Sequence, residues 1–256
     1  MPFAKVNGTQ LYYEVHGQGA PVVLVHGGAS NHISWYRQVV ALRDHYTVIT
    51  YDQRGFGFSE ENGDYEASAV EDLRGLLDHL GYQKVALLGQ SLGGAVVAGF
   101  TSRYPERVRA LVLSSTPAGL VDTGRTAPPA DQPQPPYAEL VKSMIGQDDF
   151  AKRSPEIHFL VEQLIGINTR VSARRLNGTF YARNEIAPII DAGVPVLLLN
   201  GDDDPRGTTG HMEKIRSQIP GARLVIVPGG GHLVYIENSD PYNREVLEFL
   251  AAHPGD

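Results

Sequence analysis

The stretch that decides the fold is KVALLGQSLGGAVVA, from Lys84 to Ala98. Within it, Val85–Leu88 is an apolar run too short for a helix, and Gly89 ends it. After Ser91 come a leucine, two glycines and small apolar residues that can pack closely against a sheet. The stretch therefore predicts a buried strand, a sharp turn that carries the serine, and a helix. Its segment GQSLG matches the pattern G-x-S-x-G, which is weak alone and specific between such a strand and helix.

The glycines and the helix around this serine have a chemical meaning. A serine in a strained turn requires neighbours without side chains, because the two backbones must approach each other. The N-terminus of the following helix directs its dipole and free N–H groups towards an oxyanion formed beside the serine. The alternative is a loop of glycine and serine that performs no chemistry.

Composition narrows the class of protein. Of the 256 residues, 42% are hydrophobic, which is enough for a sizeable core. The formal net charge of −7, without a long basic run, argues against nucleic acid as a partner. The chain has no cysteine, which excludes disulfides, Cys-ligated zinc and a cysteine nucleophile. No apolar segment resembles a signal peptide or a membrane span, so we expect a cytoplasmic protein without a membrane partner. We expect neither a metal nor a cofactor, and either a monomer or a homodimer.

Short apolar runs alternate with helical patterns along most of the chain, which predicts an α/β fold. The predicted strands are Phe3–Val6, Thr9–Val15, Pro21–Val25, Tyr46–Tyr51, Val85–Leu88, Arg107–Ser114, Val194–Asn200 and Ala222–Val227. The predicted helices include Ile33–Leu42, Glu66–Leu80, Met212–Gln218 and Asp240–Ala252. This alternation indicates a mostly parallel sheet with helices on both faces and the first hairpin as an antiparallel edge.

The pattern changes between residues 119 and 191. Residues 126–136 contain five prolines and no periodicity, and three short helical patterns follow without a strand. These patterns cover Tyr137–Met144, Pro155–Ile165 and Val171–Tyr181. We predict a helical cap at 119–191, inserted into a core formed by 1–118 and 192–256. The alternative is that these helices cover a face of the sheet.

A serine hydroxyl becomes a nucleophile only beside a base, and the base needs an acid that fixes its tautomer. Both partners should follow strands, because ligands of open parallel sheets bind beyond the carboxyl ends of the strands. Among nine histidines, His232 alone follows a predicted strand through a triple-glycine loop. For the acid, Asp204 is preferred, with Asp203 and Asp202 as alternatives in the same run. His26, in a His-Gly-Gly turn, is expected to brace that loop.

An oxyanion formed at Ser91 would require two N–H donors. One is expected from the backbone of Leu92, directly after the serine. The other is expected from the loop after the third strand, at Gly28 or alternatively Ala29.

Together with these candidate residues, the sequence resembles the α/β-hydrolase superfamily over nearly all of the chain outside the predicted cap. Four motifs carry the resemblance: His26–Gly28, Asp52–Ser59, Gly89–Gly93, and Gly231-His232 with Glu237, Pro241 and Asn243 downstream. The resemblance implies a catalytic triad of Ser91, Asp204 and His232 and an oxyanion hole at Gly28 and Leu92. It implies a mainly structural role for Asp52 and Arg54.

The resemblance also narrows the reaction, because haloalkane dehalogenases and epoxide hydrolases, as families, carry aspartate where this chain has Ser91. A serine implies a small-molecule hydrolase that cleaves a carboxylic ester or lactone through an acyl-enzyme. The alternatives are a C–C bond hydrolase or cofactor-free perhydrolase or oxygenase on the same triad, and a receptor without turnover.

Candidate substrate contacts are Trp35 and His158, although core packing is the more frequent role for a tryptophan. Phe56 and Phe58 are equally compatible with a place in the pocket wall and with a place in the core. A run of arginines in the predicted cap is a candidate to hold a carboxylate: Arg170, Arg174, Arg175 and Arg183.

Overall fold

The computed structural model describes residues 2–28, 30–62, 68–126, 139, 143–144, 150–168, 178–206 and 208–254. In these residues the chain forms one eight-stranded sheet with the order β1-β2-β4-β3-β5-β6-β7-β8. The strands are β1 Phe3–Val6, β2 Thr9–His16, β3 Pro21–Val25, β4 Thr47–Tyr51, β5 Val85–Gln90, β6 Val108–Ser114, β7 Val196–Gly201 and β8 Arg223–Val227. The pairs β1–β2 and β2–β4 are antiparallel, and the remaining pairs are parallel. The predicted α/β fold, with its antiparallel edge hairpin, is confirmed.

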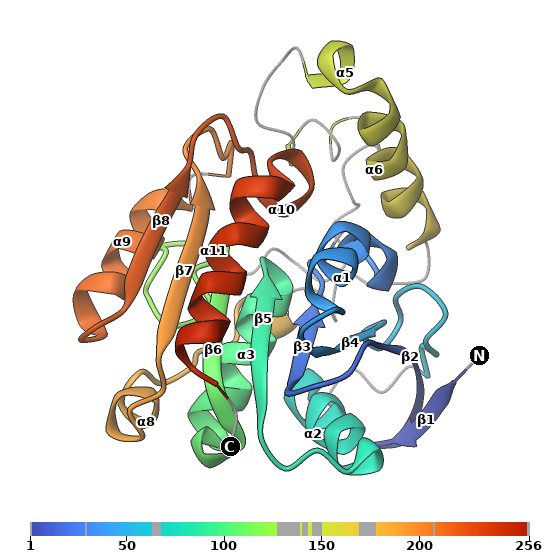
Figure 1. Ribbon diagram of the computed structural model, residues 1–256, viewed down its shortest axis with the longest axis vertical. Coiled ribbons are helices and arrows are strands. Elements are labelled where there is room, and N and C mark those ends of the chain that lie inside the picture. The colour runs from blue at the N-terminus through green and yellow to red at the C-terminus, as the bar shows by residue number, and fades with distance from the viewer. Residues whose placement is uncertain are drawn as a thin grey trace.

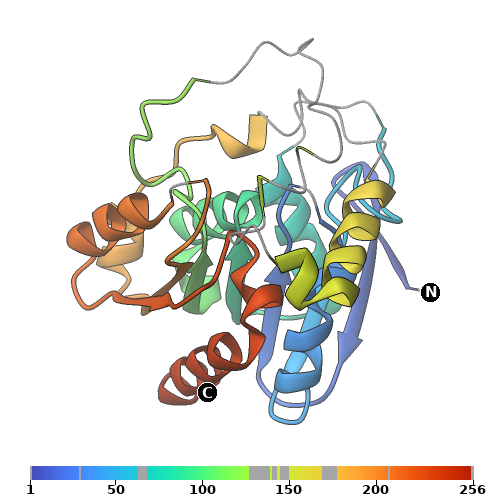
Figure 2. The ribbon, with the colours of Figure 1, turned by 90° about the horizontal axis from the view of Figure 1, so that it is seen from above.

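Helices cover both faces of the sheet (Figures 1 and 2). The helical elements are η1 His32–Trp35, α1 Tyr36–Leu42, α2 Ala69–Leu80, α3 Leu92–Arg103, η2 Pro105–Arg107, α5 Phe150–Arg153, α6 Pro155–Ile167, α8 Ala187–Asp191, α9 Thr209–Gln218, α10 Val234–Glu237 and α11 Ser239–Ala252. One apolar core joins the sheet to α2, α3, α8 and α9, and a second joins its other face to α1, α10 and α11. Strands buried from both sides explain why β3, β5, β6 and β7 are continuous apolar runs rather than alternating ones.

Local signals in the sequence explain where several elements begin and end. The hairpin between β1 and β2 turns at Asn7 and Gly8, which both have positive φ, 45° and 73°. These are the dihedrals that a two-residue hairpin turn with right-handed strand twist requires. Helix α2 ends at Gly81 in the left-handed conformation, as its glycine predicts.

The structure differs from the predicted elements in places where the periodic signal is short. The predicted helix at Ile33–Leu42 begins as a 3-10 turn at His32, capped by the side chain of Asn31, which accepts a hydrogen bond from the N–H of Ile33. Helices α8 and α10 were not predicted, because four or five residues do not show a helical period.

Helix α6 confirms the helical pattern predicted for Pro155–Ile165 and extends it to Ile167. It lies beyond the carboxyl ends of the central strands (Figure 1). Most of the proline-rich segment and of the other two predicted helices falls outside the described residues. Helix α8 packs against α3, and Asn184 donates hydrogen bonds to the carbonyls of Ala95 and Ala118. The division into a core and a 119–191 cap stays a prediction.

In the part of the chain that is described, every helix is too short or too polar to cross a lipid bilayer.

Candidate active site

Ser91 occupies the turn between β5 and α3 and has φ 50° and ψ −114°. A non-glycine residue in this region of backbone space costs on the order of 1–3 kcal/mol and persists only where its surroundings enforce it. Here close packing enforces it. A Cβ on Gly93 would lie 2.1 Å from the carbonyl oxygen of Val25, and one on Gly89 would lie 2.5 Å from the carbonyl oxygen of Gly93. Glycine at these positions lets α3 approach β3 and β5 and lifts the serine above the sheet.

The loops after β7 and β8 bring an aspartate and a histidine to this serine. The Nε2 atom of His232 lies 3.0 Å from the Oγ of Ser91, and its Nδ1 lies 3.0 Å from an oxygen of Asp204. The carboxylate of Asp204 also accepts hydrogen bonds from the N–H of Arg206, at 2.9 Å, and from the hydroxyl of Thr208. The structure thus joins the three preferred residues in one hydrogen-bonded chain.

The two alternative acids, Asp202 and Asp203, form hydrogen bonds with the glycine loop that precedes His232. Asp202 is exposed and accepts a hydrogen bond from the N–H of Gly229 at 2.6 Å. Asp203 is also exposed, and its N–H donates to the carbonyl of Gly230. These contacts hold the β7 loop against the glycine loop that precedes His232. Of the three aspartates, only Asp204 directs its carboxylate at the imidazole.

Burial sets the protonation of the pair. The imidazole of His232 is almost completely buried, and this desolvation lowers its pKa below the ordinary value, although the carboxylate of Asp204 opposes the change. Burial alone would raise the pKa of Asp204, but the hydrogen bond and charge of His232, with the hydroxyl of Thr208, lower it. At neutral pH the imidazole is therefore neutral and the carboxylate is ionised. With Nδ1–H donating to Asp204, Nε2 is the nitrogen that can take a proton from Ser91.

Of the two residues predicted as oxyanion donors, Leu92 follows Ser91 in the chain and Gly28 lines the same cavity. Leu92 is the first residue of α3, where a backbone N–H has no partner within the helix. Gly28 lines the cavity at Ser91 and belongs to a turn closed by a hydrogen bond from the N–H of Ser30 to the carbonyl of Gly27. The alternative donor, Ala29, lies outside the described residues.

A narrow cavity lies at Ser91 between the sheet and α6. Its polar wall includes Gly28, Ser30, Gln90 and His232, and Gln90 donates to the carbonyl of His232 at 3.0 Å. Its remaining wall is apolar and comes from Met144, Val161, Leu164, Ile165, Leu233 and Ile236. The wall next to the serine hydroxyl is therefore mostly apolar.

Helix α6 is the part of this wall that sequence reasoning did not assign. Val161, Leu164 and Ile165 share one face of the helix, at the spacing of three and four residues that marks a buried stripe. The sequence shows this stripe, but it does not show which surface the stripe covers.

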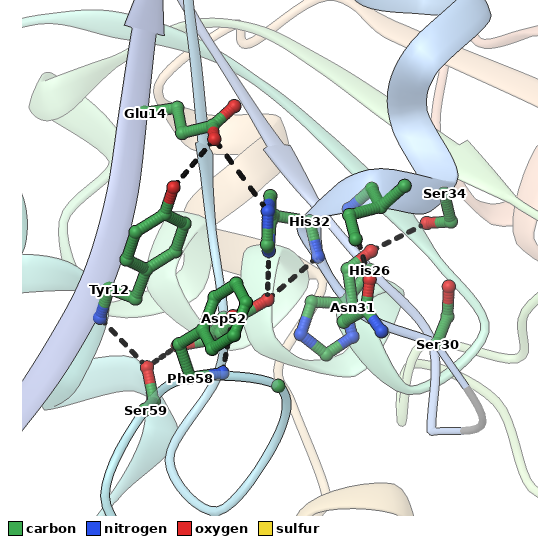
Figure 3. A network of polar contacts seen from close by, with 12 residues as sticks. Tyr12, Glu14, His26, Ser30, Asn31, His32, Ser34, Asp52, Phe58 and Ser59 are labelled. Carbon is green, nitrogen blue, oxygen red and sulfur yellow. Dashed lines mark hydrogen bonds and ion pairs between the residues drawn. The ribbon is translucent and has the colours of Figure 1, made fainter. Parts of the chain in front are cut away.

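A buried polar network supports the loop that carries Gly28 (Figure 3). One oxygen of Asp52 accepts hydrogen bonds from the backbone N–H and from the Nδ1 of His32, at 2.8 and 2.7 Å. The other accepts from the N–H of Phe58 at 2.8 Å. Asp52 thus joins the end of β4 to the start of η1, which agrees with the structural role implied for it.

His26 braces the same loop, as predicted. Its Nδ1 donates to the carbonyl of Gly27 at 2.8 Å, and its Nε2 accepts from the N–H of Gln53 at 3.0 Å. Complete burial lowers the pKa of His26 to about 4, so the ring is neutral at neutral pH.

Neither predicted substrate contact lines the cavity. Trp35 is fully buried in the core, with its ring 4.4 Å from that of Tyr235, so no solvent-accessible surface remains for a substrate. His158 lies on α6 beside the apolar stripe and faces Glu162, at 3.7 Å. The prediction for Trp35 is corrected, because the tryptophan fills the core. The prediction for His158 stays a prediction.

Of the remaining candidates, the three that the structure describes do not line the cavity at Ser91. Phe56 is buried against the ring of His26, whereas Phe58 is half exposed beside Tyr12. Arg183 pairs with Asp122 at the surface, at 3.0 Å, and lies on the wall of a second pocket. The other three arginines of the run fall outside the described residues. Within the described ranges, no group of three His, Asp or Glu side chains has the arrangement of a metal site.

Several known proteins have similar sequences. The profile of the Alpha/beta hydrolase family matches residues 22–245. A putative non-heme chloroperoxidase from Synechocystis sp. is 30% identical, over 94% of this chain and 94% of its own. A 2-hydroxy-6-oxononadienedioate/2-hydroxy-6-oxononatrienedioate hydrolase from Comamonas testosteroni is 29% identical, over 92% and 89%.

The solved structure of a thermophilic esterase from Thermogutta terrifontis superimposes with a TM-score of 0.84 at 27% identity, and the match covers 100% of both chains. The printed names of these proteins describe different reactions. The match over residues 22–245 includes both the serine turn and the loop of His232. The chain therefore belongs to the alpha/beta hydrolase family.

Proposed function

We propose that this protein is a serine hydrolase that cleaves a carboxylic ester or lactone of a small molecule through an acyl-enzyme intermediate. The observation that carries the proposal is the hydrogen-bonded chain from Ser91 through His232 to Asp204, with 3.0 Å at each step. This is the spacing at which a base can remove the proton of a nucleophile.

In the proposed reaction, Ser91 Oγ attacks the carbonyl carbon while His232 Nε2 takes its proton. The tetrahedral oxyanion accepts hydrogen bonds from the N–H groups of Leu92 and Gly28. As the C–O bond to the alcohol breaks, His232 returns the proton to the departing oxygen. A water molecule, deprotonated by His232, then attacks the acyl-enzyme, and the proton goes back to Ser91 Oγ as the acid leaves.

The narrowness of the cavity and its mostly apolar wall support a small apolar acyl group. Its roof consists of the side chains of Val161, Leu164 and Ile165, which bury a hydrocarbon but offer no partner for a charge. Linear esters with two to four acyl carbons, and lactones of similar size, are the substrates we propose first.

Ser91→Ala tests the proposal. We expect hydrolysis of p-nitrophenyl acetate to be lost, while the melting temperature stays close to that of the wild type. Intact mass spectrometry of the wild type during turnover should show an acyl adduct on the peptide that contains Ser91. A variant that keeps wild-type activity would overturn the assigned nucleophile.

A second candidate is suggested by two relatives, whose names describe a chloroperoxidase and a C–C bond hydrolase of an oxo-diacid. Both would use the same serine with another substrate or acceptor. A panel of esters, lactones and β-diketones, assayed with and without hydrogen peroxide, separates these reactions. Cleavage of the diketones alone, or peracid formation faster than hydrolysis, would favour the second candidate.

The third class is a receptor that binds a small molecule without turnover. The hydrogen bond between Ser91 and His232 argues against a receptor, because a receptor does not need a base at its serine. Ligand-induced stabilisation without product would favour this class. Cytoplasmic location, a monomeric or homodimeric state, and the lack of nucleic-acid or membrane partners stay predictions from the sequence.

A further inference from the structure

Asn168 caps the end of α6, and its side-chain amide contacts three segments of the chain. Its Oδ1 accepts a hydrogen bond from the N–H of Gly57 at 3.2 Å. Its Nδ2 donates to the carbonyl of Ser30 at 2.8 Å and to that of Leu164 at 3.2 Å. One amide therefore joins the roof of the cavity, the loop after β4 and the loop that carries Gly28.

The contact with Ser30 differs from the other hydrogen bonds that hold this loop. His26 and Asp52 support the loop from the sheet side, through Gly27 and His32. Ser30 is the residue at which the turn that contains Gly28 ends, and it also lines the cavity. Asn168 holds this end of the turn from the side of α6.

The same amide holds the roof. Leu164, whose carbonyl accepts from Nδ2, lines the cavity with its side chain, and so does Ile165, whose carbonyl accepts from the N–H of Asn168 at 3.1 Å. The position of these side chains relative to Gly28 therefore depends on Asn168. A displacement of α6 would be transmitted to the turn through the carbonyl of Ser30.

We propose that Asn168 is a positioning residue, which sets the placement of the Gly28 turn relative to Ser91 and links it to the roof helix. The inference rests on the proposed function, because it concerns an N–H donor for the oxyanion of that reaction. It predicts that Asn168 acts on the transition state more than on the bound substrate, since the oxyanion forms only as the reaction proceeds.

The chemistry of the amide shows how to test this. An amide offers a donor to the carbonyl of Ser30 and an acceptor to the N–H of Gly57 at the same time. In Asn168→Asp the carboxylate has the same shape and still accepts from Gly57, but it repels the carbonyl oxygen of Ser30. This variant disconnects the turn while the contact with Gly57 remains. Asn168→Ala removes both contacts and serves as the second variant.

We expect Asn168→Asp to lower kcat for p-nitrophenyl acetate by about 10- to 100-fold, because a misplacement of about 1 Å has an effect of this size. KM should change by less than about threefold, because the bound ester does not yet carry an oxyanion. An alkylboronic acid, whose adduct with Ser91 places an oxygen where the oxyanion forms, should bind more weakly by about the same factor as kcat/KM falls.

Asn62 provides the matched control. Its amide also donates to a backbone carbonyl, that of Gly8, and accepts from an N–H of Arg54, at 2.6 and 3.0 Å. It lies outside the turn and the roof. Asn62→Asp should leave kcat, KM and boronate affinity at wild-type values, whatever it does to the melting temperature.

The outcomes separate this inference from the proposed function. Unchanged kcat and boronate affinity in both Asn168 variants, with hydrolysis lost in Ser91→Ala, would overturn the role of Asn168 alone. A raised KM with unchanged kcat would also overturn it, since Asn168 would then serve only the apolar wall. A wild-type protein that neither hydrolyses esters nor reacts with a fluorophosphonate at Ser91 would overturn both.

Discussion

At the scale of single residues, three consecutive aspartates follow β7, and they differ in what their carboxylates contact. Asp204 accepts a hydrogen bond from the imidazole of His232, whereas Asp202 is exposed and accepts one from a backbone N–H. A carboxylate that accepts from Nδ1 holds the imidazole in the tautomer whose Nε2 is free for the serine proton. The assignment of roles at this site therefore depends on one contact rather than on residue type.

Asp204→Asn should lower kcat for p-nitrophenyl acetate by about 10³- to 10⁴-fold, because an amide favours the wrong tautomer and does not stabilise the imidazolium. Asp203→Asn, one residue away and exposed, is the matched control and should change kcat by less than about twofold. Steady-state kinetics on both variants checks the pair. Equal losses in the two variants would show that the acid is assigned to the wrong residue.

His26 makes stability depend on pH. The pKa of His26 is about 4 in the folded chain, below the ordinary value of 6.5. Between these two values the imidazole is protonated in the unfolded chain and neutral in the folded chain. The associated stability is complete above pH 6.5 and is lost as pH falls towards 4, by roughly 3 kcal/mol in total. Urea unfolding of the wild type and of His26→Gln between pH 7 and pH 4.5 measures it. The variant is expected to be less stable at pH 7 and to lose less stability on acidification.

At the scale of elements, the turn between β5 and α3 depends on how closely its backbones approach. Gly93 lies in the first turn of α3, against the carbonyl end of β3, where a single methyl group has no room. Not every helical glycine is constrained in this way: Gly210, at the start of α9, has open space around the position of a Cβ. The sequence pattern distinguishes Gly93 from Gly210, because Gly93 belongs to the G-x-S-x-G motif around the serine.

Gly93→Ala should destabilise the protein by about 3 kcal/mol or more, since its Cβ would lie 2.1 Å from a backbone oxygen that cannot move without disrupting the strand. Gly210→Ala should be neutral or stabilise by up to about 1 kcal/mol, because alanine is the better helix former. Urea unfolding of both variants makes the comparison. A Gly93→Ala protein as stable as Gly210→Ala would contradict the packing argument.

At the scale of the whole molecule, the site is assembled between the sheet and α6. The sheet and its following loops supply Ser91, Asp204 and His232, and α6 supplies the apolar stripe above them. Residues on the other sides of α6 lie in solvent, as the exposed Ile167 shows. For the proposed reaction, we expect the face of α6 that meets the sheet to control which acyl groups fit.

Ile165→Trp should reduce the cavity and lower kcat/KM for p-nitrophenyl butyrate by about tenfold or more relative to the acetate ester, because a pocket discriminates by the volume it leaves. Ile167→Trp, on the same helix but 46% exposed, should leave the ratio of the two esters unchanged. Kinetics with both esters gives the ratio directly. A change of the ratio only in the Ile167 variant would place the acyl pocket elsewhere.

The sequence by itself determined the strand–turn–helix at Ser91, the antiparallel edge hairpin and the alternation that builds the parallel sheet. It could do so because these features depend on local properties: apolar runs of strand length, the periodicity of α2, and glycines where φ is positive or space is lacking. His232 also stood out locally, as the histidine that follows a strand through glycines. Short elements such as α10 were not predicted, because four residues are too few to show a helical periodicity.

Only the tertiary structure decided which of the three aspartates meets His232 and that Trp35 fills the core. It also decided that the stripe on α6 covers Ser91 and that Asn168 reaches the loop of Gly28. Each of these facts is a distance between atoms far apart in the chain. Such distances follow from how the sheet and α6 pack, and no local pattern of residues encodes them.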